Sequence, residues 1–314
     1  MAIDGGKTIF KHAWGMRRHD RPEPCTTSTN FRLASVTKQF TASTVLLLAD
    51  RGVVVLDDTL DRFFPGCPDY WRQITVHHLL SHTSGLPDYE DLIPKGTTLQ
   101  LSDLNVLALL RDTKEPLFEP GTKFAYSNSG YTLLGLIVES AAERPFHRFM
   151  QTEVFDSVGM NGSVLYVAGM NSVPERAFGH ELNDDSRWTV GDQSVTSAVR
   201  GDGGVYSSLD DLERWLAALE GDFLLSKAST RAMFLPHVKT DRGEDHYGYG
   251  WFLGNYRGER RVMHAGSTRG FSLMLQRFPD RQAAVLILLN RASPKPPENY
   301  VEQIVNLLIF DRGE

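Results

Sequence analysis

Apolar side chains recur at helical spacing in several stretches of this chain. Between Val36 and Asp50 they share one helical face, and Gly52 stands where a helix commonly ends, so this stretch is predicted to be a helix. The same spacing, with Ser or Thr at several expected starts, predicts further helices. These lie within residues 74–89, over Ser102–Asp112, Tyr131–Glu143 and Phe146–Val158, within residues 207–221, and over Glu298–Phe310.

Patterns typical of β-strands dominate the last part of the chain. Residues 247–256, 260–266, 268–278 and 282–290 are rich in aromatic and β-branched residues, and short polar turns separate them. One more strand is expected at the start, over Lys7–Gly15. Arg18–Asn30 is predicted to be a loop and residues 53–71 an extended segment.

This order of elements predicts an α/β (α+β) fold, with an antiparallel sheet flanked by helices and built from both chain ends. A mostly helical segment is inserted between those ends. We expect residues 1–58 and 197–314 to form the sheet domain and residues 59–196 the helical domain. The active site is expected in the cleft between them.

Composition narrows the range of functions. The chain has 314 residues, 41% hydrophobic and 23% charged, as in an ordinary globular protein. A formal net charge of −6 gives no reason to expect a nucleic-acid partner, and no stretch is long enough to predict a membrane span. The first residues lack the apolar core of a secretory signal, which predicts a cytoplasmic protein unless a leader has been removed. Two cysteines predict free thiols, and neither a metal nor a cofactor is expected.

The first candidate for chemistry is the pair formed by Ser35 and Lys38. Side chains three residues apart on a helix are neighbours, so the amine can reach the hydroxyl oxygen. A serine hydroxyl becomes a nucleophile when a neighbour takes its proton, and a helix N-terminus favours the negative charge of acyl transfer. The alternative is structural, with Ser35 acting only as a helix cap and Lys38 exposed to solvent.

Two more motifs, in order along the chain, complete a resemblance to a known family. The chain resembles the class C β-lactamases and their penicillin-recognising relatives, which include D-alanyl-D-alanine carboxypeptidases, D-aminopeptidases and family VIII carboxylesterases. The likeness spans about Asp4 to Asn290 and includes the phrases LLSHTSGLPDY and GDGGVYSSLDDLERW. The motifs that carry it are Ser35-Val36-Thr37-Lys38, Tyr126-Ser127-Asn128 and His264-Ala265-Gly266.

The resemblance implies a β-lactamase/transpeptidase-like fold and a serine hydrolase that works through an acyl-enzyme. In such an enzyme Ser35 attacks a carbonyl group, while Lys38 and Tyr126 share the proton transfer. The sequence does not decide which of these two is the base. Asn128 would bind the amide side chain of the substrate and orient Lys38.

The resemblance also implies how the substrate carbonyl is held. His264 and Gly266 would lie on the strand that walls the site, where glycine lets the substrate approach the backbone. The N–H groups of Ser35 and Ser267 would form the oxyanion hole.

The third motif departs from the β-lactamase pattern, because His264 stands where those enzymes usually carry lysine. A histidine offers less positive charge at neutral pH for the carboxylate of a β-lactam, although Arg269 or another cation could supply it. We therefore expect a small-molecule ester or amide substrate, of the carboxylesterase or D-amino-acid peptidase type. The alternatives are a β-lactamase with a β-lactam substrate, and a penicillin-binding sensor that is acylated without turnover.

The N-terminus is the second departure. Relatives usually begin with a helix and one more strand before the segment that matches Lys7–Gly15. Their absence would remove a strand next to the C-terminal one, which predicts either a truncated N-terminus or a sheet edge that is filled some other way. An open sheet edge favours pairing with another chain, so a homo-oligomer is one expected outcome.

Overall fold

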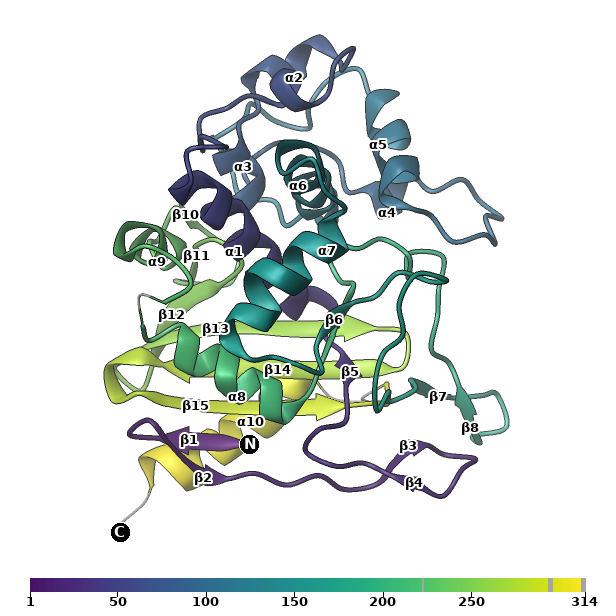
Figure 1. Ribbon diagram of the computed structural model, residues 1–314, viewed down its shortest axis with the longest axis vertical. Coiled ribbons are helices and arrows are strands. Elements are labelled where there is room, and N and C mark those ends of the chain that lie inside the picture. The colour runs from purple at the N-terminus through teal and green to yellow at the C-terminus, as the bar shows by residue number, and fades with distance from the viewer. Residues whose placement is uncertain (222, 293–295, 312–314) are drawn as a thin grey trace.

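The computed structural model describes residues 1–221, 223–292 and 296–311. Within these ranges the largest sheet has eight antiparallel strands, in the order β10-β11-β12-β13-β14-β15-β1-β2 (Figure 1). Its strands are β1 (Ala2–Asp4), β2 (Lys7–Phe10), β10 (Val238–Lys239), β11 (His246–Tyr247), β12 (Phe252–Tyr256), β13 (Glu259–Thr268), β14 (Phe271–Phe278) and β15 (Ala283–Leu289). The predicted α/β class, with an antiparallel sheet built from both chain ends, is confirmed.

The place beside β15 is occupied by β1, so the predicted alternative in which this sheet edge is filled some other way is the one that the structure shows. Ala2 of β1 pairs with Val285, and Ile3 pairs with Ala284. The chain then turns back, and β2 pairs with β1 to become the edge of the sheet. Three residues before the predicted strand are enough to fill the position.

Helices cover both faces of this sheet. Helix α8 (Leu209–Ala218) lies on one face, and α10 (Pro297–Val305), continued by a π-helical turn over Asn306–Phe310, lies on the other (Figure 1). Strand β14 is buried along its whole length, because a strand covered on both faces has no solvent side. The predicted C-terminal helix and the predicted helix within residues 207–221 are both confirmed, and Ser208 caps the latter.

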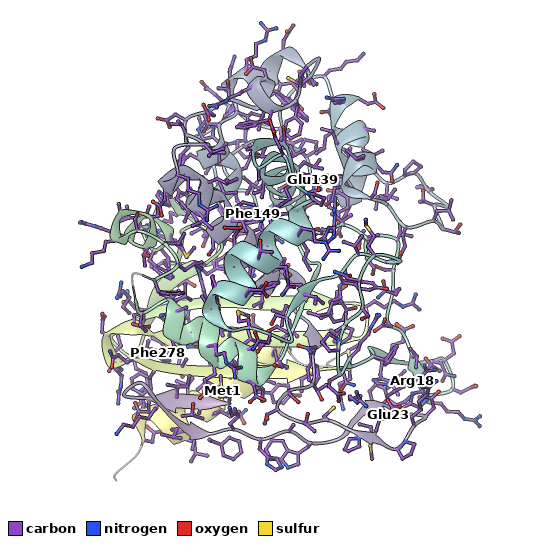
Figure 2. All side chains as sticks on the ribbon, in the orientation of Figure 1. Met1, Arg18, Glu23, Glu139, Phe149 and Phe278 are labelled. Carbon is purple, nitrogen blue, oxygen red and sulfur yellow. The ribbon has the colours of Figure 1, made fainter. Side chains whose placement is uncertain are left out.

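Most of the remaining helices gather on the side of the large sheet where β12 and β13 lie (Figure 1). In Figure 2, the labelled Glu139 and Phe149 lie among these helices, whereas Met1 and Phe278 lie at the sheet. Within the described residues no helix is long and apolar enough to cross a membrane. The helices are α1 (Thr37–Asp50), α2 (Leu60–Phe63), α3 (Val76–Leu80), α4 (Tyr89–Leu92), α5 (Asp103–Arg111), α6 (Asn128–Ala141), α7 (Phe146–Met150) and, beside the sheet, α9 (Lys227–Met233).

Two segments were predicted to contain no helix or strand, and both predictions were wrong in part. Residues 53–71 contain α2 and a 3-10 turn that begins at Asp69, where Leu60 and Trp71 are buried. The predicted loop over Arg18–Asn30 contains β4 (Glu23–Pro24), which pairs with β3 (Met16–Arg18). These four elements are only two to five residues long, which is too short for a periodic pattern to reveal.

A small three-stranded sheet positions two segments of the candidate site. In it, β9 (Val205–Ser207) lies between β5 (Phe31–Arg32) and β6 (Val164–Leu165). Strand β5 leads directly into the turn that carries Ser35, and β9 directly follows the segment of Asp202. Two segments far apart in sequence are thereby held side by side. A separate hairpin pairs β7 (His180–Leu182) with β8 (Trp188–Val190).

Candidate active site

Ser35 lies in a 3-10 turn, η1 (Ala34–Val36), directly before α1. No side chain caps α1, so the alternative in which Ser35 serves only as a helix cap is wrong. Ala34 has a φ of 45°, a left-handed conformation that is uncommon outside glycine and costs roughly 1 kcal/mol or more. Such strained residues cluster at functional sites, and this one fixes the direction in which the serine leaves the strand.

Gly266 of β13 allows this turn to pack against the large sheet. A Cβ atom at Gly266 would lie 2.4 Å from the carbonyl oxygen of Leu33 and 3.4 Å from the Cβ of Ala34. Any side chain would therefore push the turn, and Ser35 with it, away from β13. The glycine of the third motif thus sets how closely the nucleophile approaches the strand.

Lys38 follows one turn later and is fully buried, so its predicted solvated alternative is wrong. Its Nζ donates to Ser35 Oγ at 3.3 Å, to Asn128 Oδ1 at 2.7 Å and to the carbonyl oxygen of Asp202 at 3.1 Å. An ammonium group has three N–H bonds, and these three acceptors match them. The network joins the first two sequence motifs in space.

Tyr126 lies beside this amine. Lys38 Nζ is 4.9 Å from the centre of its ring, and within the described part of the chain the phenol oxygen is buried without a hydrogen-bond partner. His82 holds the segment in place: its carbonyl oxygen accepts from the N–H of Ala125, and its Nδ1 accepts from the N–H of Ser127. Burial, reinforced by Lys38, lowers the pKa of His82, which keeps the ring neutral and Nδ1 able to accept.

Asn128 is fixed by hydrogen bonds on three sides. Its backbone N–H donates to Asp88 Oδ2 at 2.7 Å, its Oδ1 accepts from Lys38, and its Nδ2 donates to Glu90 Oε1 at 3.2 Å. Helix α6 therefore begins at Asn128, three residues before the predicted start at Tyr131. The acceptor that Asp88 supplies comes from a distant segment, which local periodicity does not show.

A buried carboxyl group lies on the far side of the lysine. Asp202 Oδ2 accepts from the hydroxyl of Tyr89 at 2.9 Å. Burial raises the pKa of Asp202 to about 6, while the charge of Lys38 acts in the opposite direction. Asp202 thus contributes both a carbonyl acceptor and negative charge beside the lysine.

His264 lies beside Tyr126. Its ring centre is 6.2 Å from that of Tyr126, and Nε2 is 3.2 Å from the hydroxyl of Tyr247. Burial, reinforced by Lys38, lowers the pKa of His264 to about 3, so the imidazole is neutral at pH 7. Ser267 lies three residues further along β13 and is exposed.

The neutral state of His264 makes a prediction for stability. The folded protein binds a proton at His264 less readily than the unfolded chain does. The stability that neutral His264 contributes is therefore present above about pH 6.5 and is lost as the pH falls. Between pH 7 and pH 5 the free energy of unfolding should fall by about 2 kcal/mol more in the wild type than in His264→Gln. Urea unfolding at both pH values measures this difference.

The exposed His12 provides the control for that measurement. His12→Gln should retain the pH dependence of the wild type. Equal losses of stability in the wild type and in His264→Gln would contradict a buried, neutral imidazole.

The structure adds residues that the motifs alone did not single out. Their signals were present in the phrases that carry the resemblance, because four lie in or beside LLSHTSGLPDY and one lies in GDGG. What the sequence lacked was any indication that both phrases meet at the lysine. The added residues are His82, Asp88, Tyr89, Glu90 and Asp202.

Comparison with known proteins agrees with this arrangement. The model of the family described as Beta-lactamase matches residues 1–308. Penicillin-binding protein 4* of Bacillus subtilis (strain 168) is 32% identical over 332 aligned positions, which cover 99% of this chain and 71% of that protein. A D-aminopeptidase of Gluconobacter oxydans (strain 621H) is 28% identical, and the match covers 93% of this chain and 55% of that protein. The chain thus spans about half the length of the second relative.

A solved structure shows the same fold. The octameric penicillin-binding protein homologue from Pyrococcus abyssi superposes with a TM-score of 0.87 at 27% sequence identity. The match covers 98% of this chain and 72% of that chain. The family predicted from three short motifs is confirmed.

Proposed function

The chain belongs to the Beta-lactamase family and is a serine hydrolase, and we propose that it cleaves small esters or amides through an acyl-enzyme on Ser35. One observation carries the proposal. The fully buried Lys38 donates to Ser35 Oγ at 3.3 Å and to Asn128 Oδ1 at 2.7 Å, in contact with the ring of Tyr126. A structural role for Ser35 requires none of these contacts.

In the proposed reaction, Ser35 Oγ forms a bond to the substrate carbonyl carbon, and its proton passes to the neighbouring base. An ammonium that donates to Ser35 does not at the same time accept its proton, which favours Tyr126 as the acceptor. Tyr126 takes that proton as a phenolate, which the neighbouring ammonium of Lys38 would stabilise, and becomes a neutral phenol. The phenol then returns the proton to the leaving group as the scissile bond breaks. Water cleaves the acyl-enzyme in the second half, and the N–H groups of Ser35 and Ser267 are proposed to bind the developing oxyanion.

The charges around the site support ester or amide substrates over β-lactams. His264 is buried and neutral, so it offers no cation to a substrate carboxylate. The other predicted cation, Arg269, is engaged elsewhere: its guanidinium donates to Glu181 and to the carbonyl oxygen of Gln193. We therefore propose carboxylesterase or D-amino-acid peptidase chemistry, with β-lactamase activity as the weaker alternative.

Mass spectrometry of the protein mixed with p-nitrophenyl acetate tests this proposal. We expect an acetyl group on the Ser35 peptide that forms rapidly and then disappears as acetate is released. A lasting adduct without turnover would support the penicillin-binding sensor instead. Faster turnover of nitrocefin than of p-nitrophenyl acetate would support the β-lactamase.

A homo-oligomer also remains a proposal. The edge strand β2 is mostly exposed, and an exposed edge is able to pair with another chain. The solved homologue from Pyrococcus abyssi is octameric, which shows that a related fold assembles.

A further inference from the structure

Asp202 lies in a segment whose backbone is held at three successive carbonyl groups. The carbonyl oxygens of residues 201–203 accept, in order, from Thr41 Oγ1 at 2.7 Å, from Lys38 Nζ at 3.1 Å and from Arg32 Nε at 3.2 Å. Glycine stands on both sides of Asp202, so the carboxylate is the only side-chain functional group that residues 201–203 bring to the site. These bonds fix where the carboxylate lies relative to the lysine.

The flanking glycines let this segment pack closely against two other elements. A Cβ atom at Gly201 would collide with the carbonyl oxygen of Tyr131 in α6. A Cβ atom at Gly203 would lie 3.6 Å from the Cα of Ala34. The segment is thus held between α6 and the turn that carries Ser35.

The carboxylate of Asp202 is buried and is not neutralised by an ion pair. Among the described residues, its hydrogen-bond donor is the hydroxyl of Tyr89, and no cation lies within ion-pair distance of it. Burial raises the pKa of Asp202 to about 6, whereas the charge of Lys38 and the bond from Tyr89 lower it. The carboxylate is therefore mostly ionised at pH 7, and the lysine favours that state.

Other charged or titratable groups also face this pair. Those facing the carboxylate are Arg32 of β5, Tyr89 and Glu90 of α4 and Asp103 of α5, and those facing the lysine are Glu90, His82, His264, Tyr126 and Tyr131. Burial keeps both histidines neutral. Glu90 is exposed to solvent, and Asp103 forms an ion pair with Arg200. The buried, unpaired negative charge beside Lys38 is therefore that of Asp202.

We infer that Asp202 is a positioning residue whose carboxylate keeps the buried Lys38 in the ammonium form. A fully buried ammonium is unfavourable unless an opposite charge compensates for it, and the three acceptors of Lys38 are neutral oxygens. In the proposed reaction this ammonium stabilises the phenolate of Tyr126. The inference rests on the proposed acyl-enzyme chemistry and specifies what holds its base in the active state.

Asp202→Asn tests the inference, because it removes the charge and keeps the contacts. The backbone carbonyl still accepts from Lys38, and the side-chain oxygen is able to accept from Tyr89. We expect the alkaline limb of kcat/KM for p-nitrophenyl acetate, plotted against pH, to move to lower pH by about one unit or more, because the ammonium has lost its counter-charge. A purely structural role for Asp202 would instead lower kcat/KM equally at every pH.

Asp91 supplies the matched control, because it lies in α4, is exposed and undergoes the same change of charge. Asp91→Asn should retain the wild-type pH profile. An alkaline limb that stays in place in a folded Asp202→Asn, or moves equally in Asp91→Asn, would overturn the inference alone. A wild type inert toward p-nitrophenyl acetate, or one as active without the Ser35 hydroxyl, would overturn the proposed function itself.

Stability provides a second test that does not depend on activity. Asp202→Asn leaves a buried ammonium uncompensated, and Lys38→Met leaves a buried carboxylate uncompensated, so each change should lower the melting temperature. The double variant should lose less than the sum of the two. Should Asp202→Asn fail to fold, the double variant should still fold. Additive losses, or a double variant that is also unfolded, would contradict a compensating pair of charges.

Discussion

Ser35→Ala is expected to lower kcat for p-nitrophenyl acetate by about 10⁴-fold or more, since losing a covalent nucleophile removes the whole acyl-enzyme route. The fold should survive the change. Lys38 keeps two of its three acceptors, Asn128 Oδ1 and the carbonyl oxygen of Asp202, and the backbone turn at Ala34 is unaffected. Steady-state hydrolysis and thermal unfolding of the same preparation measure both results.

Ser28→Ala is the control, because Ser28 is an exposed serine in the segment that precedes β5. It should leave both kcat and the melting temperature near those of the wild type. Undiminished turnover in Ser35→Ala, with the melting temperature unchanged, would rule out Ser35 as the nucleophile. It would also remove the basis for every role proposed for its neighbours.

The sheet and the long helices were predictable because their patterns are local. Strands β13 to β15 and helices α1, α5 and α10 each repeat an apolar spacing over seven or more residues, long enough to specify the element. The turn at Ser35 was not predictable, because the conformation of Ala34 and its packing on Gly266 depend on a strand more than 200 positions away. The helix was predicted to begin at Val36, one residue before the observed start of α1 at Thr37.

The candidate site was likewise predictable only in part. Ser35, Lys38, Tyr126 and Asn128 could be named from motifs, and the structure brings all four together. Their electrostatics could not be predicted, because charges from distant segments create them. Asp202 and Glu90 reach the lysine and its partner through tertiary contacts, and the neutrality of His264 comes from complete burial. The division of the chain into two domains around a cleft stays a prediction.

Two tyrosines lie beside Lys38, and comparing their variants distinguishes a catalytic role from a structural one. Lys38 Nζ lies 4.9 Å from the ring centre of Tyr126 and 5.6 Å from that of Tyr131. The phenol of Tyr131 donates to the carbonyl oxygen of Leu80 at 2.8 Å, whereas within the described ranges the phenol oxygen of Tyr126 has no partner. A hydroxyl that is buried without a partner costs stability, so its presence calls for a functional explanation.

Tyr126→Phe should therefore lower kcat by about 10³-fold, a typical contribution of general acid–base catalysis, while the free energy of unfolding changes by less than about 0.5 kcal/mol. Tyr131→Phe should do the reverse: it should lose about 1–2 kcal/mol of stability, because the Leu80 carbonyl is left without its donor, and change kcat little. Ester hydrolysis and urea unfolding of both variants provide the comparison. Equal activity losses in the two would mean that Tyr126 only packs against Lys38, and the proton would then have to pass to Lys38 itself.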